Sequence, residues 1–98
     1  MAKFIIRVEL HNANYQDYET LHDSMYKEGF SKTIQDELTK EWFNLPTAEY
    51  YYENALIDDY NIIIDKVKIA ANKTNKIFGI VVTKAIVVRW EGLDKVKN

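Results

Sequence analysis

The sequence predicts an α+β domain of the split βαβ, ferredoxin-like type, an antiparallel sheet with two helices on one face. Hydrophobic periodicity gives the order strand, helix, strand, strand, helix, strand, followed by a short extra strand. The 98 residues are 47% hydrophobic, which suits a small two-layer core. No repeat or linker divides the chain, so we expect a single domain over residues 1–98.

The first strand and the first helix carry the clearest signals. Lys3 to Leu10 alternates, which predicts a strand with one apolar face (Phe4, Ile6, Val8, Leu10) and one mixed face (Ile5, Arg7, Glu9, His11). Asn14 is a suitable N-cap for a helix over about residues 15–28, with Asp17 in its first turn. Gly29 suits the left-handed position that ends such a helix.

The later elements are shorter or less sharply bounded. We expect strands at 30–34, 47–53 and 77–83, extended chain at 41–43, a helix over 56–73 capped by Asn54 or Asp58, and a short strand at 86–90. The helix should bury Leu56, Ile57, Tyr60, Ile63, Ile64, Val67 and Ala71. In a split βαβ sheet the first and third strands are central, and the helices should be buried through Leu21, Met25, Ile63 and Val67.

Composition excludes several classes of site. The chain has no Cys and two His, so we expect no zinc site, no iron–sulfur cluster and no Cys nucleophile. It has no Gly-rich phosphate loop, so no nucleotide cofactor is expected. No apolar run approaches the roughly 20 residues of a membrane helix, so we expect no membrane partner. The lack of Cys is compatible with a reducing cytoplasm, which is the expected location.

Charge is distributed unevenly along the chain. Residues 1–65 carry 5 Lys/Arg and 13 Asp/Glu, whereas residues 66–98 carry 8 Lys/Arg and 2 Asp/Glu. A basic C-terminal third can attract a phosphate backbone, and Lys84 and Arg89 are the candidate contacts. Alternatively, charges that are separate in the sequence interleave in the fold and cancel.

Arg7, Glu9 and His11 should form a column on the open face of the sheet. An acid, a base and a cation in that arrangement could cleave RNA through its own 2′-hydroxyl, with His11 moving the proton and Arg7 stabilising phosphate charge. The same column could be a salt-bridged solvent face, in which each exposed pair contributes about 0–1 kcal/mol. The spacing alone favours the solvent face.

Aromatic residues offer a second candidate site. Alternation along Tyr50-Tyr51-Tyr52 places Tyr51 on the open face, where it could stack an unpaired base, and the other two inward. Trp42 and Trp90 are expected as core or interface anchors. His22 lies near the apolar stripe of its helix and is expected to be a partly buried packing residue.

Several stretches of the chain match a pattern found in small bacterial proteins: Arg7–Ala13, Asp17-Tyr18, Leu21-His22, Met25, Glu28–Ile34, Leu45–Tyr50, Val82-Thr83, Trp90 and Gly92-Leu93. In these stretches the chain resembles the GhoS-type antitoxins. The resemblance implies a ferredoxin-like fold, similar to that of the small CRISPR-adaptation proteins. It also implies an endoribonuclease that cuts the messenger of a membrane-acting toxin in a type V toxin–antitoxin pair. The candidate site residues come from strand geometry and not from this resemblance.

A non-enzymatic interaction module, carried by a phage or mobile element, remains the alternative function. The run Ile86-Val87-Val88 is apolar on both faces, and an unpaired strand of that kind invites pairing. We therefore expect a homodimer in which residues about 84–92 join or cover a sheet edge.

Overall fold

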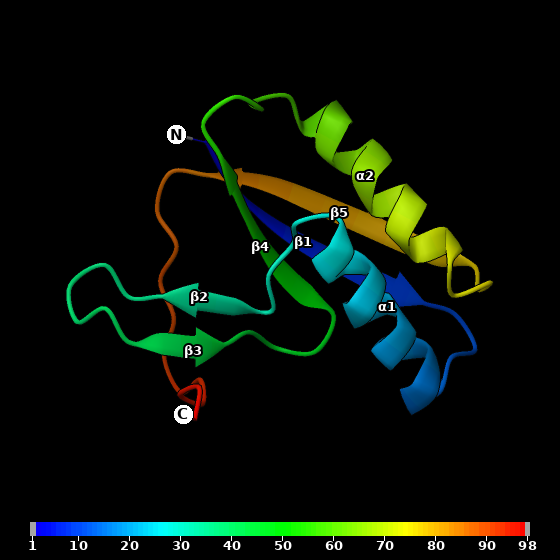
Figure 1. Cartoon of the computed structure of the whole chain (residues 1–98), viewed down its shortest axis with the longest axis horizontal. Helices are drawn as coiled ribbons and strands as arrows, with labels where there is room; N and C mark the ends of the chain where they lie inside the picture. The colour runs from blue at the N-terminus through cyan, green and yellow to red at the C-terminus, as the bar shows by residue number, and fades with distance from the viewer. Residues whose placement is uncertain (1, 98) are drawn as a thin grey trace.

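A computed structural model describes residues 2–97 of the chain. The elements in chain order are β1 (Ala2–Leu10), α1 (Tyr15–Lys27), β2 (Thr33–Gln35), β3 (Trp42–Asn44), β4 (Glu49–Asn54), α2 (Tyr60–Asn72) and β5 (Phe78–Ala85). Figure 1 shows the long strands β1, β4 and β5 beside the two helices, with the β2–β3 hairpin set to one side. The α+β class with antiparallel sheets is therefore confirmed.

β1 is the central strand of the main sheet, as predicted, but the third expected strand, 47–53, is β4 and lies at an edge of that sheet instead of sharing its centre with β1. The strand order is β4-β1-β5 and both pairings are antiparallel, so that Ile5 faces Tyr51 on one side and Thr83 on the other. β2 and β3 form a separate hairpin. The hairpin adjoins β4 at one bridge, where Ser31 N–H donates to Tyr51 O at 2.9 Å and Tyr51 N–H donates to Ser31 O at 2.8 Å.

Both helices pack on the same face of this sheet. Alternate residues of β1 lie in the core with those of the helices, and the four side chains chosen to anchor the helices (Leu21, Met25, Ile63 and Val67) are all 0% exposed. Tyr50 and Tyr52 point into the same core from β4, as the alternation predicted. Burial of a side chain of this kind contributes roughly 1.5–3 kcal/mol, so this face holds the domain together.

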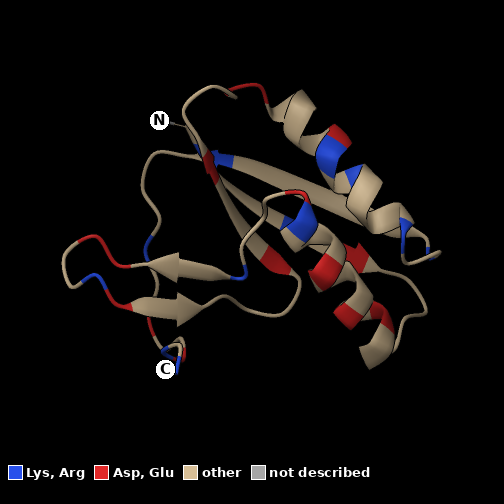
Figure 2. Ribbon diagram, viewed as in Figure 1, with Lys and Arg blue, Asp and Glu red and all other residues tan. Residues whose placement is uncertain are grey.

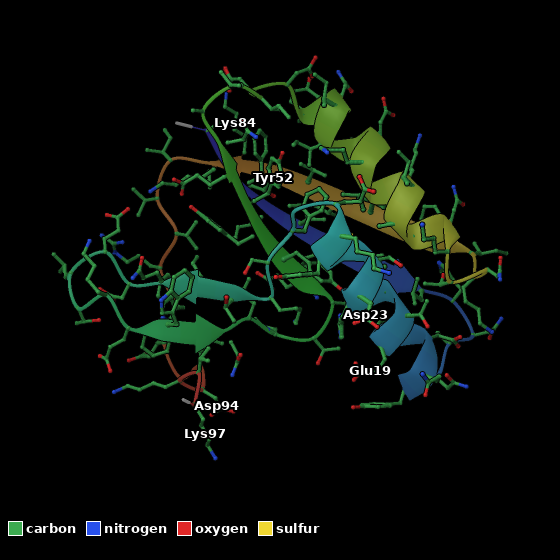
Figure 3. All side chains as sticks on the ribbon, in the orientation of Figure 1. Glu19, Asp23, Tyr52, Lys84, Asp94 and Lys97 are labelled. Carbon is green, nitrogen blue, oxygen red and sulfur yellow. The ribbon has the colours of Figure 1, made fainter. Side chains whose placement is uncertain are left out.

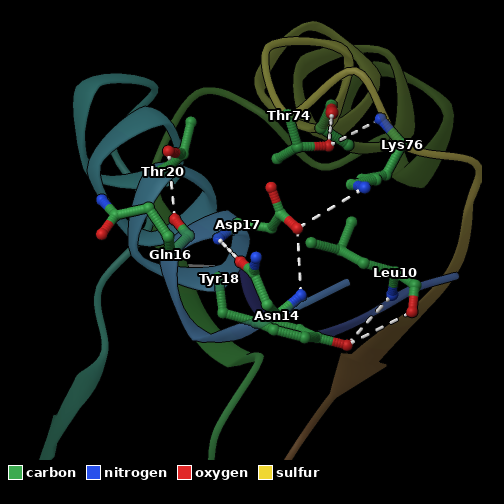
Figure 4. Close-up of polar contacts among 9 residues, drawn as sticks. Leu10, Asn14, Gln16, Asp17, Tyr18, Thr20, Thr74 and Lys76 are labelled. Atoms are coloured by element: carbon green, nitrogen blue, oxygen red, sulfur yellow. Dashed lines mark hydrogen bonds and ion pairs between the residues drawn. The ribbon is translucent and has the colours of Figure 1, made fainter. Parts of the chain in front are cut away.

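The N-terminus of α1 is fixed by a reciprocal cap (Figure 4). Asn14 Oδ1 accepts from Asp17 N–H, and Asp17 Oδ2 accepts from Asn14 N–H, both at 3.0 Å. The same carboxylate lies 3.7 Å from Lys76 Nζ, which ties the start of α1 to the turn after α2. At the other end Gly29 has φ +95°, the left-handed conformation predicted for it.

The second helix begins later than predicted. Asn54 does not cap it, because its side-chain oxygen accepts from the N–H groups of Leu56 and Ile57 and closes a turn there. Asp58 does not cap it either. The N-cap is Asp59, which accepts from Asn61 N–H at 2.8 Å. Leu56 therefore lies outside the helix and is 93% exposed. Tyr60, the first residue of the helix, is 56% exposed and not buried as expected, while Ile63, Val67 and Ala71 are buried.

Residues 86–90, here called the strap, do not form the predicted strand. After β5 the chain leaves the sheet and runs to the hairpin, where the rings of Trp90 and Phe43 lie 5.6 Å apart. Asn44 N–H then donates to Asp94 O, and Val96 N–H to Trp42 O, both at 2.9 Å. Trp90 therefore anchors the end of the strap on β3, whereas Ile86 and Val87 stay 93% and 61% exposed, so this apolar run is neither a strand nor a buried segment.

The predicted strand at 30–34 is likewise reduced, to the bridge at Ser31 and the three residues of β2. Of the helices within residues 2–97, none is both long and apolar enough to cross a membrane.

Candidate functional site: the open sheet face and its cavity

The side of the main sheet that the helices leave uncovered is called the open face here. It carries Lys3, Ile5, Arg7 and Glu9 of β1, Glu49, Tyr51 and Glu53 of β4, and Gly79, Val81 and Thr83 of β5. This face contains two groupings of chemical interest. One is the column along β1, and the other is a cavity around Tyr51.

The column predicted on β1 is present. Arg7 and Glu9 are exposed on the open face, and His11 follows directly after the strand. His11 Nε2 lies 3.4 Å from Glu9 Oε1, and His11 N–H donates to Ile77 O at 2.8 Å, which holds the residue at the end of the sheet. Arg7 faces Glu49 and Val81 on the neighbouring strands. The column can present a cation and an imidazole–carboxylate pair to a ligand that lies along β1.

Tyr51 lies on the open face but is less free than the sequence indicates. Its side chain is half-buried, and its hydroxyl donates to Glu53 Oε1. Burial, reinforced by the hydrogen bond to Glu53, raises the pKa of the Tyr51 hydroxyl well above its usual range. The phenol is therefore neutral throughout the physiological range, and its ring forms one wall of a hollow.

The hollow is a cavity of about 320 Å³ between one end of the open face, the residues after β2 and the strap. It is lined by Lys3, Ile34, Gln35, Asp36, Glu37, Leu38, Tyr51, Ile86, Val87, Val88, Arg89 and Trp90. A neighbouring hollow of about 380 Å³ shares Lys3, Ile34, Gln35, Glu37 and Tyr51 with it and is also lined by Trp42. The strap therefore does not form an edge strand, and its residues line a cavity next to Tyr51.

Charged groups in the cavity are held in place by hydrogen bonds. Lys3 Nζ donates to Glu37 Oε1 at 2.8 Å, which lowers the pKa of Glu37 and raises that of Lys3. Asp36 Oδ1 accepts from the N–H groups of Thr39 and Leu38 at 3.0 and 2.8 Å, and these bonds lower its pKa. Both carboxylates are thus ionised at neutral pH, opposite the cations Lys3 and Arg89.

Lys84, a candidate RNA contact, lies apart from Tyr51 and Arg89. It faces Phe4 across the β1–β5 ladder, and Phe4 points into the helix-covered core. Its ammonium pairs with Asp58 in the loop before α2, and Figure 3 shows it at that end of the sheet. Tyr51 and Arg89 share the cavity, but Lys84 lies on the other side of the sheet.

Half of the basic residues of the C-terminal third are paired with carboxylates from the acidic part of the chain. Four of its lysines form ion pairs with earlier carboxylates: Lys66 with Glu28, Lys76 with Asp17, Lys84 with Asp58 and Lys95 with Glu41. Figure 2 shows the mixture, with acidic positions along α1 close to basic ones near α2. Positive and negative side chains interleave in the fold, so the uneven distribution of charge along the sequence does not by itself produce a basic surface.

A polar cluster that the sequence did not reveal supports β4 from the helix side. Lys32 Nζ donates to the carbonyls of Leu45, Pro46 and Glu49 at 3.2, 2.6 and 3.3 Å, and it lies 5.4 Å from the ring centre of Tyr50. The Tyr50 hydroxyl lies 2.6 Å from Nδ1 of the partly buried His22.

Burial governs the titration of this cluster. It lowers the pKa values of His22 and Lys32 and raises that of Tyr50. A single lysine between Ser31 and the start of β2 is ordinary in a sequence, so only the long-range contacts of Lys32 identify its role.

The described residues contain no group of three or more His, Asp or Glu placed to hold a metal ion. Neither a family model, nor a curated protein, nor a solved structure matches this chain. The resemblance to GhoS-type antitoxins therefore stays a prediction.

Proposed function

We propose that the protein binds single-stranded RNA on its open face and cleaves it, as a GhoS-like antitoxin acting on a toxin messenger would. The observation that carries this proposal is the row of exposed Arg7, Glu9 and His11 on the same face as Tyr51. Ile5, the cross-strand partner of Tyr51, is two residues from Arg7, so the column begins roughly 7 Å along β1 from the Tyr51 row.

We also propose that the topology is ferredoxin-like, with residues 31–35 as a fourth strand outside β4. The pair of backbone hydrogen bonds between Ser31 and Tyr51 supports this arrangement. Sheets of this topology bind unpaired bases on the side opposite their helices, with aromatic residues as platforms.

In the proposed reaction, RNA lies along β1 with a phosphate at Arg7. His11 takes the proton from the 2′-hydroxyl, and the 2′-oxygen attacks the adjacent phosphorus. The bond to the 5′-oxygen breaks, that oxygen takes a proton from water, and the protonated His11 gives its proton to the hydroxide that is left. The products are a 2′,3′-cyclic phosphate and a 5′-hydroxyl end, and no electrons are exchanged. Glu9, 3.4 Å from His11, orients the imidazole, and Arg7 stabilises charge on the non-bridging oxygens.

The test is cleavage of a labelled single-stranded RNA in the presence of a chelator, with product ends identified. His11→Ala should slow cleavage by roughly 10²–10⁴-fold, because it removes the proton-transfer group. Arg7→Ala should weaken binding and reduce the salt slope by about one. The matched control is Lys68→Gln, which removes one exposed cation from α2, on the far side of the sheet.

Two results would overturn the proposal. One is wild-type protein that neither binds nor cuts RNAs of varied sequence. The other is His11→Ala that cuts at the wild-type rate, which would leave the imidazole without a catalytic role.

A second candidate function is interaction through the free edge of β5. Among residues 2–97, β5 pairs only with β1, its eight residues contain no Pro, and Val81 in its middle is 60% exposed. Edges of this length invite a further strand, and a second copy of the chain supplies one. The expected contact region, residues about 84–92, starts at the end of β5, and Ile86 and Val87 there are 93% and 61% exposed, so the interface of this homodimer is the edge of β5 together with the start of the strap.

Sedimentation at micromolar concentration tests the dimer. Wild type should sediment as a dimer, and Val81→Lys should sediment as a monomer because a charge at the centre of the edge opposes pairing. A wild-type protein that is purely monomeric would refute this second function and leave the RNA proposal untouched.

A further inference from the structure

We propose that the cavity between Tyr51 and the strap is a nucleobase pocket, which takes one base of the bound RNA and prefers bases with an exocyclic amino group. This inference rests on the proposed function and adds the part of the RNA that the site recognises.

The walls of the cavity suit a flat, partly polar ring. Its volume of about 320 Å³ is at the lower end of the range for ligand pockets, which matches one base better than a larger ligand. The ring of Tyr51 forms one wall, and the apolar side chains of Ile34, Val87 and Trp90 line others. A base that entered would stack on the tyrosine ring and leave water, as bases do in single-strand binding sites.

Two carboxylates, Asp36 and Glu37, lie at the polar side of the cavity, which the cations Lys3 and Arg89 also line. Asp36 and Glu37 each use one carboxylate oxygen in the contacts described above. The second oxygen of each makes no hydrogen bond within the described range 2–97. Carboxylates accept from base amino groups, so guanine, adenine and cytosine find partners here. Uracil has no amino group, and its one donor on the Watson–Crick edge, N3–H, stands between two carbonyls that these carboxylates repel.

Arg89 accounts for the phosphate that accompanies the base. Among residues 2–97 its guanidinium makes one hydrogen bond, to the carbonyl of Val88 at 3.3 Å, and Arg89 lines the cavity. Lys3 is already paired with Glu37, so Arg89 is the cation left for an incoming phosphate. Arg89 of the strap would then bind the phosphate while Tyr51 of the sheet stacks on the base.

Tryptophan fluorescence gives a direct measure of occupancy. The chain has two tryptophans, and both line this pair of hollows, Trp90 the cavity and Trp42 its neighbour. Titration of the full chain with GMP, AMP and CMP should change the emission, and UMP should require at least several-fold higher concentration. A short RNA ending in guanosine should bind more tightly than each mononucleotide.

Three variants separate the contributions. Tyr51→Leu should weaken RNA binding about 5- to 150-fold through loss of stacking, whereas Tyr51→Phe, which keeps the ring, should bind like wild type. Arg89→Gln should weaken binding and lower the salt slope by about one. Lys68→Gln is again the matched control, and circular dichroism confirms that each variant is folded.

The outcomes distinguish this inference from the function on which it rests. If RNA binds through Arg7 but tryptophan emission is unchanged and Tyr51→Leu binds like wild type, the base pocket is refuted and the proposed function stands. If UMP binds as well as GMP, the preference for amino bases is refuted. If no RNA binds, both are refuted.

Discussion

Replacing Lys32 with methionine should destabilise the domain by about 2–3 kcal/mol. The ammonium donates to three carbonyls of the segment 45–49, and a hydrogen bond from a charged donor contributes about 1.5–3 kcal/mol. The stabilisation from three such bonds is partly offset by the cost of holding the charge half-buried. The same burial lowers the pKa of Lys32. Methionine keeps the stem that packs there but leaves the carbonyls without their donor.

The assay is urea unfolding followed by circular dichroism, with Lys68→Met as the control. Lys68 is exposed on α2, so its replacement should stay within about 0.5 kcal/mol of wild type. Segment 45–49 leads into β4, so Lys32→Met should also loosen the strand that carries Tyr51. A Lys32→Met variant as stable as the Lys68→Met control would show that the three hydrogen bonds contribute nothing net, and the reasoning would be wrong.

Two further substitutions and one titration probe other parts of the fold. Gly29→Ala should cost about 1–2 kcal/mol in thermal unfolding, because Gly29 has φ +95° and the added Cβ would meet a core tyrosine ring at 3.4 Å. Gly79→Ala meets nothing within 4 Å and should be close to neutral, and equal effects of the two would contradict this. His22 has a folded pKa lowered from 6.5 mainly by burial, so the unfolded chain binds more protons and stability should fall as the pH drops below about 6.5. Urea denaturation at pH values from 5 to 7.5 should show a smaller loss of stability at low pH for His22→Gln than for wild type. His11→Gln should lose as much stability as wild type.

The sequence predicted those elements whose signals are local. β1 alternates over its whole length, and the N-cap of α1 uses two side chains three residues apart, so both appear in the structure where expected. The same alternation correctly predicted that Tyr50 and Tyr52 face the core and that Tyr51 faces the open side of the sheet. These inferences needed no knowledge of distant contacts.

The errors concern segments that distant contacts decide. The strap is apolar enough for a strand, but the ring of Phe43, nearly fifty residues earlier in the chain, draws Trp90 away from the sheet. The start of α2 was misplaced because Asn54, Asp58 and Asp59 are equally good caps in isolation: the prediction named the first two, and the structure uses Asp59. The charges of the C-terminal third were visible in the sequence, but their acidic partners were not.

The candidate site was predictable in its column but not in its cavity. Alternation alone places Arg7, Glu9 and His11 in one row, and the structure has that row. The cavity depends on the strap passing near Lys3 and Tyr51, which are far apart in the sequence, so no spacing rule could reveal it. The partners of Lys32 were hidden for the same reason.

The central claim is that RNA lies on the open face along β1. The most direct measurement is a two-dimensional amide NMR titration of the labelled full chain with a short single-stranded RNA. The account predicts that the shifts concentrate in Lys3–His11, in Glu49–Glu53, in Gly79–Thr83 and in the strap, with α1 and α2 unaffected. Shifts confined to the helices, or a spectrum that does not change at millimolar RNA, would contradict it.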